Sequence, residues 1–369
     1  MDKPTTLWQQ KSPQIARIPH PTWIHPPTNP PTDGNIWPSN LIKIIRAIKQ
    51  IPPGQPSRPE FSFKLLDEAA EKNFLILIRK YGGCLADALA AQKDSAVGYG
   101  SEFRVVATLS NIFQRHPNWT RMSRILTHGS EWPLAPINEE CRLADVREAL
   151  IFGNHKGALM KPDLLLQLMS KDVHFGYCLP LPLAKAEKIP GVLIAPMNIQ
   201  QQNTINEFGR IIPKDRQTHN QSFKWSSGTS VNSRIKTEEL LPCLFGACIK
   251  QIVNWVVTAR RLFPNVPILA SKTDFKSAFR QCHLNAATAV QTCTQLNKIG
   301  ILLMMLRLSF GGKPCPFEWG VISETICDLA NAILLSGDWD PSELLLQTNI
   351  WFPRTNSSSQ TSPLPLVPS

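Results

Sequence analysis

The residues best suited to chemistry lie in two short segments of the C-terminal half. The first, Lys-Thr-Asp-Phe-Lys-Ser-Ala-Phe-Arg at 272–280, follows the apolar stretch Val266–Ala270. We therefore predict a buried strand that delivers Asp274 at its end. A carboxylate in that place suits Mg²⁺, which prefers oxygen ligands, but an aspartate before a turn also serves as a helix N-cap. For Asp274 taken alone, both interpretations stay open.

The second segment is Leu-Arg-Leu-Ser-Phe-Gly-Gly-Lys-Pro-Cys-Pro-Phe-Glu at 306–318, which precedes an amphipathic helical pattern over Glu318–Leu335. Glycine has no Cβ, so Gly311 and Gly312 allow a nucleotide or a template to approach the backbone closely. An ordinary strand-to-helix turn uses the same residue types. In the first segment, Lys276 and Arg280 are candidates for phosphate contacts, and for Arg280 we favour a solvated side chain.

Periodicity places further elements around these segments. Val192–Gln200 and Gly209–Gln217 are predicted strands joined by Asn203–Phe208, and the second carries Lys214 and Arg216. Thr288–Leu296 and Gly300–Phe310 form a second predicted hairpin. Helical spacing of apolar residues predicts the following helices: one from about Phe61 to Gly82, Glu102–Arg115, Arg121–Thr127, Glu139–Phe152, Lys161–Ser170, Leu240–Phe263 and Glu318–Leu335.

The order of these segments resembles retrotransposon reverse transcriptases of the DIRS-like and long-terminal-repeat types, including copies from diatoms and oomycetes. Their motif A is an Asp-x-Lys-Ala/Ser-aromatic segment, as at 274–279, and their motif B is a Phe-Gly-x-x-x-x-Pro segment, as at 310–316. Arg216-Gln-Thr-His-Asn-Gln-Ser followed by Ser230-Val-Asn232 is similar to their fingers segment, although Asn220 and Ser233 replace acidic residues. The resemblance covers roughly residues 150–340.

The resemblance implies RNA-directed DNA synthesis on an RNA or DNA template–primer with deoxynucleoside triphosphates. Asp274 would be the catalytic ligand of Mg²⁺ or Mn²⁺, and Phe279 would exclude a ribose 2′-hydroxyl, although core packing is the alternative for this ring. The remaining nucleotide-binding residues implied by the resemblance are Lys214, Arg216, Phe275, Lys276, Gly311 and Gly312.

The family's third motif, aromatic-x-Asp-Asp, does not occur after Glu318, and Asp338-Trp-Asp340 is the nearest acidic pair. Two metal ions in a nucleotidyl-transfer site need several carboxylates. We therefore expect a truncated reverse transcriptase with no polymerase activity from this chain alone. The alternatives are a non-catalytic nucleic-acid-binding remnant and a domesticated interaction scaffold that uses its proline-rich arm.

These features predict an α+β fold, an incomplete right-hand polymerase with fingers and a partial palm. Residues 1–60 are interpreted as a proline-rich disordered arm, in which Ile42, Ile45 and Ile48 are an alternative short helical face. A helical region at 61–175, a fingers-like region at 176–265, a partial palm at 266–340 and a disordered tail at 341–369 follow.

Composition limits the class of protein and its partners. The 369 residues are 43% apolar and 18% charged, enough for a core, and the formal charge of +11 favours a polyanionic partner. Nine scattered cysteines support neither a disulfide framework nor a zinc finger and suggest a reducing compartment. Without an apolar signal core or a membrane span, we expect a cytoplasmic or nuclear protein with no membrane partner. The oligomeric state is not predicted.

Overall fold

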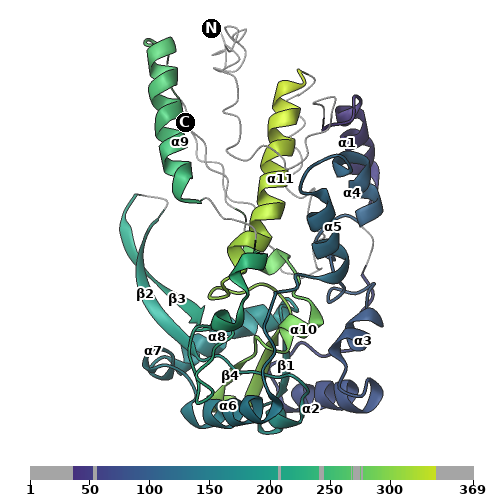
Figure 1. The fold of residues 1–369 in the computed structure, drawn as a ribbon, viewed down its shortest axis with the longest axis vertical. Coiled ribbons are helices and arrows are strands. Elements are labelled where there is room, and N and C mark those ends of the chain that lie inside the picture. The colour runs from purple at the N-terminus through teal and green to yellow at the C-terminus, as the bar shows by residue number, and fades with distance from the viewer. Residues whose placement is uncertain are drawn as a thin grey trace, which may run out of the picture. The chain divides into compact units, whose positions relative to one another are not determined.

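The computed structural model describes residues 36–52, 56–206, 209–240, 245–266, 268, 275 and 277–337 (Figure 1). The chain divides into two compact units, one of Met1–Gly34 and Leu244–Asp274 and one of Asn35–Cys243 and Phe275–Ser369. Helices and two separate antiparallel sheets occur together, so the fold is a mixed α and β structure, as expected.

Helices dominate the first half of the larger unit. One of them follows the prediction residue for residue: α6 (Glu139–Phe152) begins after Asn138, whose side chain accepts a hydrogen bond from the Glu140 amide, and ends at Gly153 with φ 74°. The others are α1 (Leu41–Gln50), α2 (Asp67–Leu75) with the π-helical turn η1 (Ile76–Lys80), α3 (Leu85–Ala90), α4 (Val106–Phe113), α5 (Trp119–His128), α7 (Lys156–Leu159) and α8 (Pro162–His174).

A three-stranded antiparallel sheet forms the centre of this unit, in the order β1 (Cys178–Pro182), β5 (Ile301–Met305), β4 (Thr294–Leu296). Every residue of the three strands is buried, because helices such as α2 and α8 pack on β1. The hairpin predicted at Thr288–Leu296 and Gly300–Phe310 is confirmed with shorter strands, and Thr288 and Ala289 are helical instead. The hairpin turns through η6 (Asn297–Ile299). Pro180 and Pro182 fit β1 because it is an edge strand.

A longer ribbon of two strands, β2 (Met197–Ile205) and β3 (Ile211–His219), pairs Met197 with His219 and Ile205 with Ile211. This confirms the hairpin predicted at Val192–Gln200 and Gly209–Gln217, with both strands shifted a few residues toward the C-terminus. Near its base the ribbon is buried at Met197, Ile199 and His219, whereas beyond these residues it is largely exposed.

The rest of the larger unit leads to its last helix. The short turn η2 (Leu183–Lys188) lies between β1 and the ribbon. After the ribbon come η3 (Asn232–Arg234), η4 (Thr237–Glu239), η5 (Ala278–Gln281) and α10 (Ala286–Ala289). The last helix, α11 (Cys315–Leu335), starts directly after Pro314 and has Pro316 in its first turn, where a missing N–H costs no hydrogen bond.

The smaller unit is described only at α9 (Phe245–Leu262) and the residues just after it. The helix ends before Pro264, as predicted, and Arg260 donates to the Pro264 carbonyl at 2.9 Å. Among the described helices, none combines the length and the apolar character needed to cross a membrane.

The expected disordered arm at 1–60 is wrong where the structure describes it. Leu41, Ile45 and Ile48 of α1 are buried, and the Trp37 ring lies 5.4 Å from the His116 ring. The alternative helical face is the arrangement observed, because α1 has a packing partner in α4. The buried strand predicted at Val266–Ala270 is wrong at the two positions that the structure describes, because Val266 is an exposed bend and Ile268 is a half-buried residue outside any strand. The rest of that segment, the pair Asp338 and Asp340, and most of both ends of the chain lie outside the described residues.

Candidate functional site

Two predicted phosphate ligands share one face of the ribbon. Side chains alternate along a strand, so Lys214 and Arg216 point to the same side, opposite Gln202 and Gln200. Both cations are exposed and form no ion pair within the part of the chain that the structure describes. Asp215 points to the other face, where Lys161 binds its carboxylate at 2.7 Å. The face of Lys214 and Arg216 therefore presents uncompensated positive charge.

The glycine loop before α11 is fastened to the segment that follows the ribbon. The Asn232 side chain donates to the Gly311 carbonyl at 2.7 Å and accepts from the Lys313 amide at 2.8 Å. Gly311 has φ 115°, and a Cβ at this position would collide with the His219 carbonyl oxygen. A Cβ at Gly312 would collide with the Trp132 ring. Atoms of the protein itself thus require glycine at both positions.

The segment after Asp274 packs on this loop and on α11. The Phe275 ring lies 5.7 Å from that of Trp319, and the Phe279 ring lies 5.1 Å from that of Phe310. Phe275 and Phe279 are half-buried and pack on these rings, and the predicted exclusion of a ribose 2′-hydroxyl by Phe279 stays a prediction. Asp274 and Lys276 lie outside the described residues, and their predicted roles stay predictions.

The interpretation of Arg280 as a solvated side chain is wrong. Its guanidinium is buried, donates to the Leu308 carbonyl at 2.7 Å and pairs with Asp172 at 2.6 Å. Burial raises the pKa of Asp172, and the charge of Arg280 opposes part of that shift. A sequence window around Arg280 holds no sign of Asp172, because α8 lies far away along the chain.

A buried polar row lies beneath the glycine loop. His219 is buried, and both of its ring nitrogens lack a hydrogen-bond partner among the described residues. Burial, with a smaller contribution from the charge of Arg280, lowers the pKa of His219 to about 3, so the ring is neutral. Gln221 follows on the same face and donates to the Ser309 hydroxyl at 3.0 Å.

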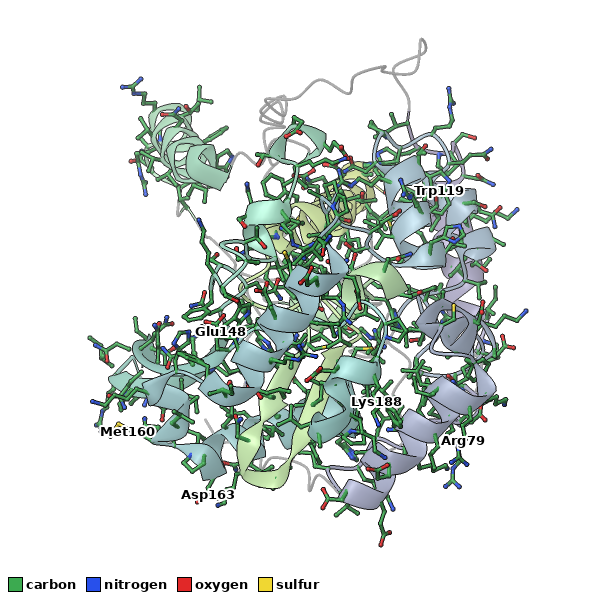
Figure 2. The ribbon with its side chains drawn as sticks, turned by 60° about the horizontal axis from the view of Figure 1, so that its bottom comes forward. Arg79, Trp119, Glu148, Met160, Asp163 and Lys188 are labelled. Carbon is green, nitrogen blue, oxygen red and sulfur yellow. The ribbon has the colours of Figure 1, made fainter. Side chains whose placement is uncertain are left out.

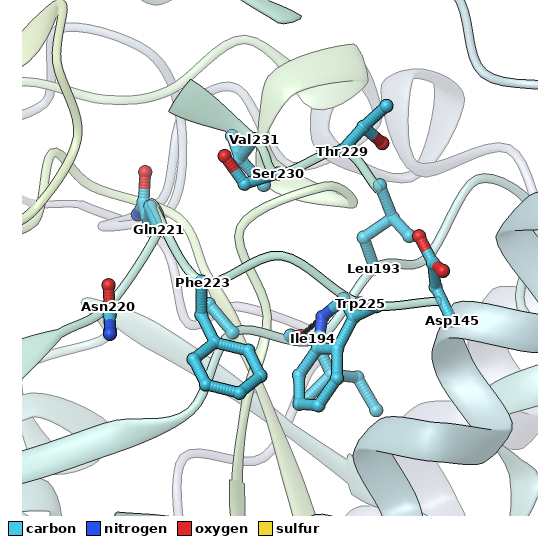
Figure 3. Close-up of a pocket in the computed structure, with 11 residues that line it drawn as sticks. Asp145, Leu193, Ile194, Asn220, Gln221, Phe223, Trp225, Thr229, Ser230 and Val231 are labelled. Atoms are coloured by element: carbon cyan, nitrogen blue, oxygen red, sulfur yellow. Dashed lines mark hydrogen bonds between the residues drawn. The ribbon is translucent and has the colours of Figure 1, made fainter. Parts of the chain in front are cut away.

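An aromatic cluster at the base of the ribbon was missed by the sequence analysis. Phe152, His155, Phe223 and Trp225 have ring centroids between 4.6 and 5.6 Å apart in five pairs. Figure 3 shows Phe223 and Trp225 side by side at a small pocket, with Asp145 beside them on α6. The pocket has room for about one water molecule. The Phe-x-Trp pattern at 223–225 was the available signal.

Asp145 holds the turn after this cluster. Its carboxylate accepts from the Ser227 amide at 3.0 Å and from the Ser227 hydroxyl at 2.7 Å. The Trp225 indole donates to the Ile194 carbonyl at 3.0 Å. These bonds fix the Phe-x-Trp segment and leave Asp145 no evident catalytic role.

The described residues contain no group of three or more His, Cys, Asp or Glu side chains arranged to hold a metal ion. Because Asp274 is not among them, the expected Mg²⁺ or Mn²⁺ remains a prediction. No protein-family model matches this chain, and searches of curated proteins and of solved structures found no match either.

Proposed function

We propose that residues 176–340 form the fingers and part of the palm of a reverse-transcriptase-like nucleotidyl-transfer fold. By this proposal the chain binds a deoxynucleoside triphosphate and template–primer but does not complete DNA synthesis by itself. One observation carries the proposal: three segments that separately resemble the family meet in space. Asn232 binds Gly311, Phe279 packs on Phe310, and Phe275 packs on Trp319.

The proposed roles divide between two surfaces. Lys214 and Arg216 on the exposed ribbon face meet the triphosphate, because ammonium and guanidinium groups form charge-assisted hydrogen bonds with phosphate oxygens. Phe279 stands beside the glycine loop, where its ring would restrict the sugar. Asp274 is the proposed metal ligand. The described residues offer no further donor set for Mg²⁺, so no step that passes through a metal is derived.

Nucleotide binding tests this proposal. The affinity for a fluorescent dATP analogue is measured with and without Mg²⁺ for the full chain and for Lys214→Gln/Arg216→Gln. Losing two charged contacts is expected to weaken binding by roughly a hundredfold or more, since hydrogen bonds to charged groups contribute about 1.5–3 kcal/mol each. Arg79→Gln is the control, because Arg79 is also exposed and lies on η1, on the opposite side of the view in Figure 2 from Met160, the C-cap of α7. The helix α7 is the one that contacts the ribbon, through β2. Equal affinity of all three proteins contradicts the proposal.

Primer extension with Mg²⁺ or Mn²⁺ is the second readout of the same experiment. No extension is expected, because these 369 residues contain no aromatic-x-Asp-Asp motif. Robust synthesis that Asp274→Ala abolishes would show that the chain is a complete polymerase, and it would overturn the claim that it cannot act alone.

The second candidate function is nucleic-acid binding without catalysis. The observation that favours it is the uncompensated charge of Lys214 and Arg216, together with the formal charge of +11. Such a protein binds RNA or DNA with an affinity that falls steeply with salt, but it shows no specific binding of dATP. The nucleotide measurement therefore separates the two candidates.

A further inference from the structure

The aromatic cluster at the base of the ribbon has an accessible side and an anchored side. Phe152, the last residue of α6, is 41% exposed, and His155 and Phe223 are half-buried. Trp225 is buried and fixed through its indole N–H. The rings contact one another, so no ligand fits between them. The accessible surface of the cluster is the outer side of Phe152, His155 and Phe223, and these rings pack on one another and on the fixed Trp225.

This cluster continues the basic face of the ribbon. Arg216, Thr218 and Asn220 alternate with inward-pointing residues, and the ladder extends past β3 because the Asn220 amide donates to the Pro196 carbonyl at 2.9 Å. The Asn220 side chain lies 3.0 Å from Nε2 of His155. From Lys214 to Asn220 the strand advances about 20 Å. Positive charge and aromatic surface therefore lie along one strip.

Exposed cations also lie near the rings. Lys156, directly after His155, and Lys224, between Phe223 and Trp225, are exposed and have no ion-pair partner within the described residues. Two carboxylates also lie near the rings, and they accept from the Ser226 and Ser227 amides: Glu148 is half-buried and Asp145 is buried, so the exposed charges beside the rings are those of the two lysines. An acidic peptide would match the cations, but it would leave the aromatic surface without a specific partner. A nucleic acid strand supplies both phosphates and flat bases.

We propose that this strip binds single-stranded nucleic acid, with one base stacked on Phe152 and Phe223 and with phosphates on Lys156, Lys224, Lys214 and Arg216. Single strands are the expected form because the faces of their bases are free to stack on aromatic rings, and such binding tolerates any sequence. This site adds base stacking to the charged face used in the proposed function, and it requires no polymerase activity.

The test compares oligothymidylate with a strand of the same length that carries abasic sites, which has the same phosphates and no bases. Fluorescence anisotropy is expected to give the full chain at least about fivefold tighter binding of oligothymidylate, since stacking of one base contributes roughly five- to a hundredfold. In Phe152→Leu, which keeps an apolar side chain but removes the ring, this preference falls toward unity. Oligouridylate is measured in parallel to show whether RNA is bound equally.

Ile151→Ala is the matched control, because Ile151 precedes Phe152 and is 88% exposed without belonging to the cluster. It should keep the preference. Photo-crosslinking of oligonucleotides containing 5-iodouracil provides a direct readout, with adducts expected at Phe152 or Phe223. Equal binding of normal and abasic strands by the full chain, or adducts only elsewhere, overturns the proposal. If the full chain prefers oligothymidylate over the abasic strand but does not bind dATP, the result contradicts only the proposed function.

Discussion

At the scale of single residues, a glycine is needed at position 311 for a reason other than the one that the sequence suggests. The Phe-Gly-Gly sequence predicts a close approach of backbone to a ligand, and the structure places the His219 carbonyl in that space. The carbonyl comes from the end of the ribbon, so the contact joins two segments remote in sequence. The glycine is therefore needed for folding whatever the loop binds.

We predict that Gly311→Ala destabilises the fold more than Gly300→Ala does. Both positions have positive φ, at 115° and 62°, so both substitutions strain the backbone. Only at Gly311 does the new Cβ meet a backbone atom, whereas nothing lies within 4 Å at Gly300. Overpacking adds about 1–3 kcal/mol. Urea unfolding of both variants measures this difference, and equal losses would contradict the contact with His219.

At the scale of elements, α1 belongs to the folded part of the chain. We predict that Ile45→Asp lowers the free energy of unfolding by about 3 kcal/mol or more, because it removes a buried side chain and buries a carboxylate. Lys43→Asp on the exposed side of the same helix should change it by less than about 1 kcal/mol. Thermal unfolding measures both. Equal effects would show that α1 does not pack on α4.

This packing also changes how the scaffold hypothesis is tested. Removal of residues 1–60 would take away α1 and Trp37 together with the proline-rich segment, and lost partner capture could then reflect a damaged core. A chain that starts at Asn35, the first residue of the larger unit, removes Met1–Gly34 with its eight prolines and keeps α1 and Trp37.

The elements that the sequence predicts well are those with local signals. The helix at 139–152 has an asparagine cap and a glycine stop, and the hairpin at 294–305 has its turn residues between apolar runs. The solvated interpretation of Arg280 is wrong, and nothing is predicted for Arg307, because the partners of both side chains are distant in sequence. Arg280 binds Asp172, and the fully buried Arg307 donates to Glu102 at 3.0 Å. Charge alone suggests solvent for such residues, and only the tertiary structure supplies their partners.

At the scale of the whole molecule, buried neutral histidines make folding depend on pH. Burial lowers the pKa of His219 to about 3 and holds the pKa of His283 well below its usual value. Both rings stay neutral in the folded state, whereas in the unfolded chain they take up a proton below about pH 6.5. Their stabilising contribution is therefore complete above that pH and is lost as the pH falls toward the folded-state pKa. Carboxylates with lowered pKa values, such as Glu60 and Glu139, change the free energy of unfolding only at lower pH.

We predict that the free energy of unfolding falls by roughly 2 kcal/mol for His219 alone between about pH 7 and pH 5, because the unfolded chain gains a proton that the folded ring refuses. His219→Met, which fills similar space and leaves the carbonyl that faces Gly311 unchanged, should remove that share of the loss. His283 should account for part of the loss in free energy of unfolding that His219→Met still shows. Urea unfolding across this pH range gives the difference. His128→Met is the control, because an exposed ring meets water in both states. An unchanged pH dependence in His219→Met would mean that the ring is protonated in the folded protein and has found a partner beneath the glycine loop.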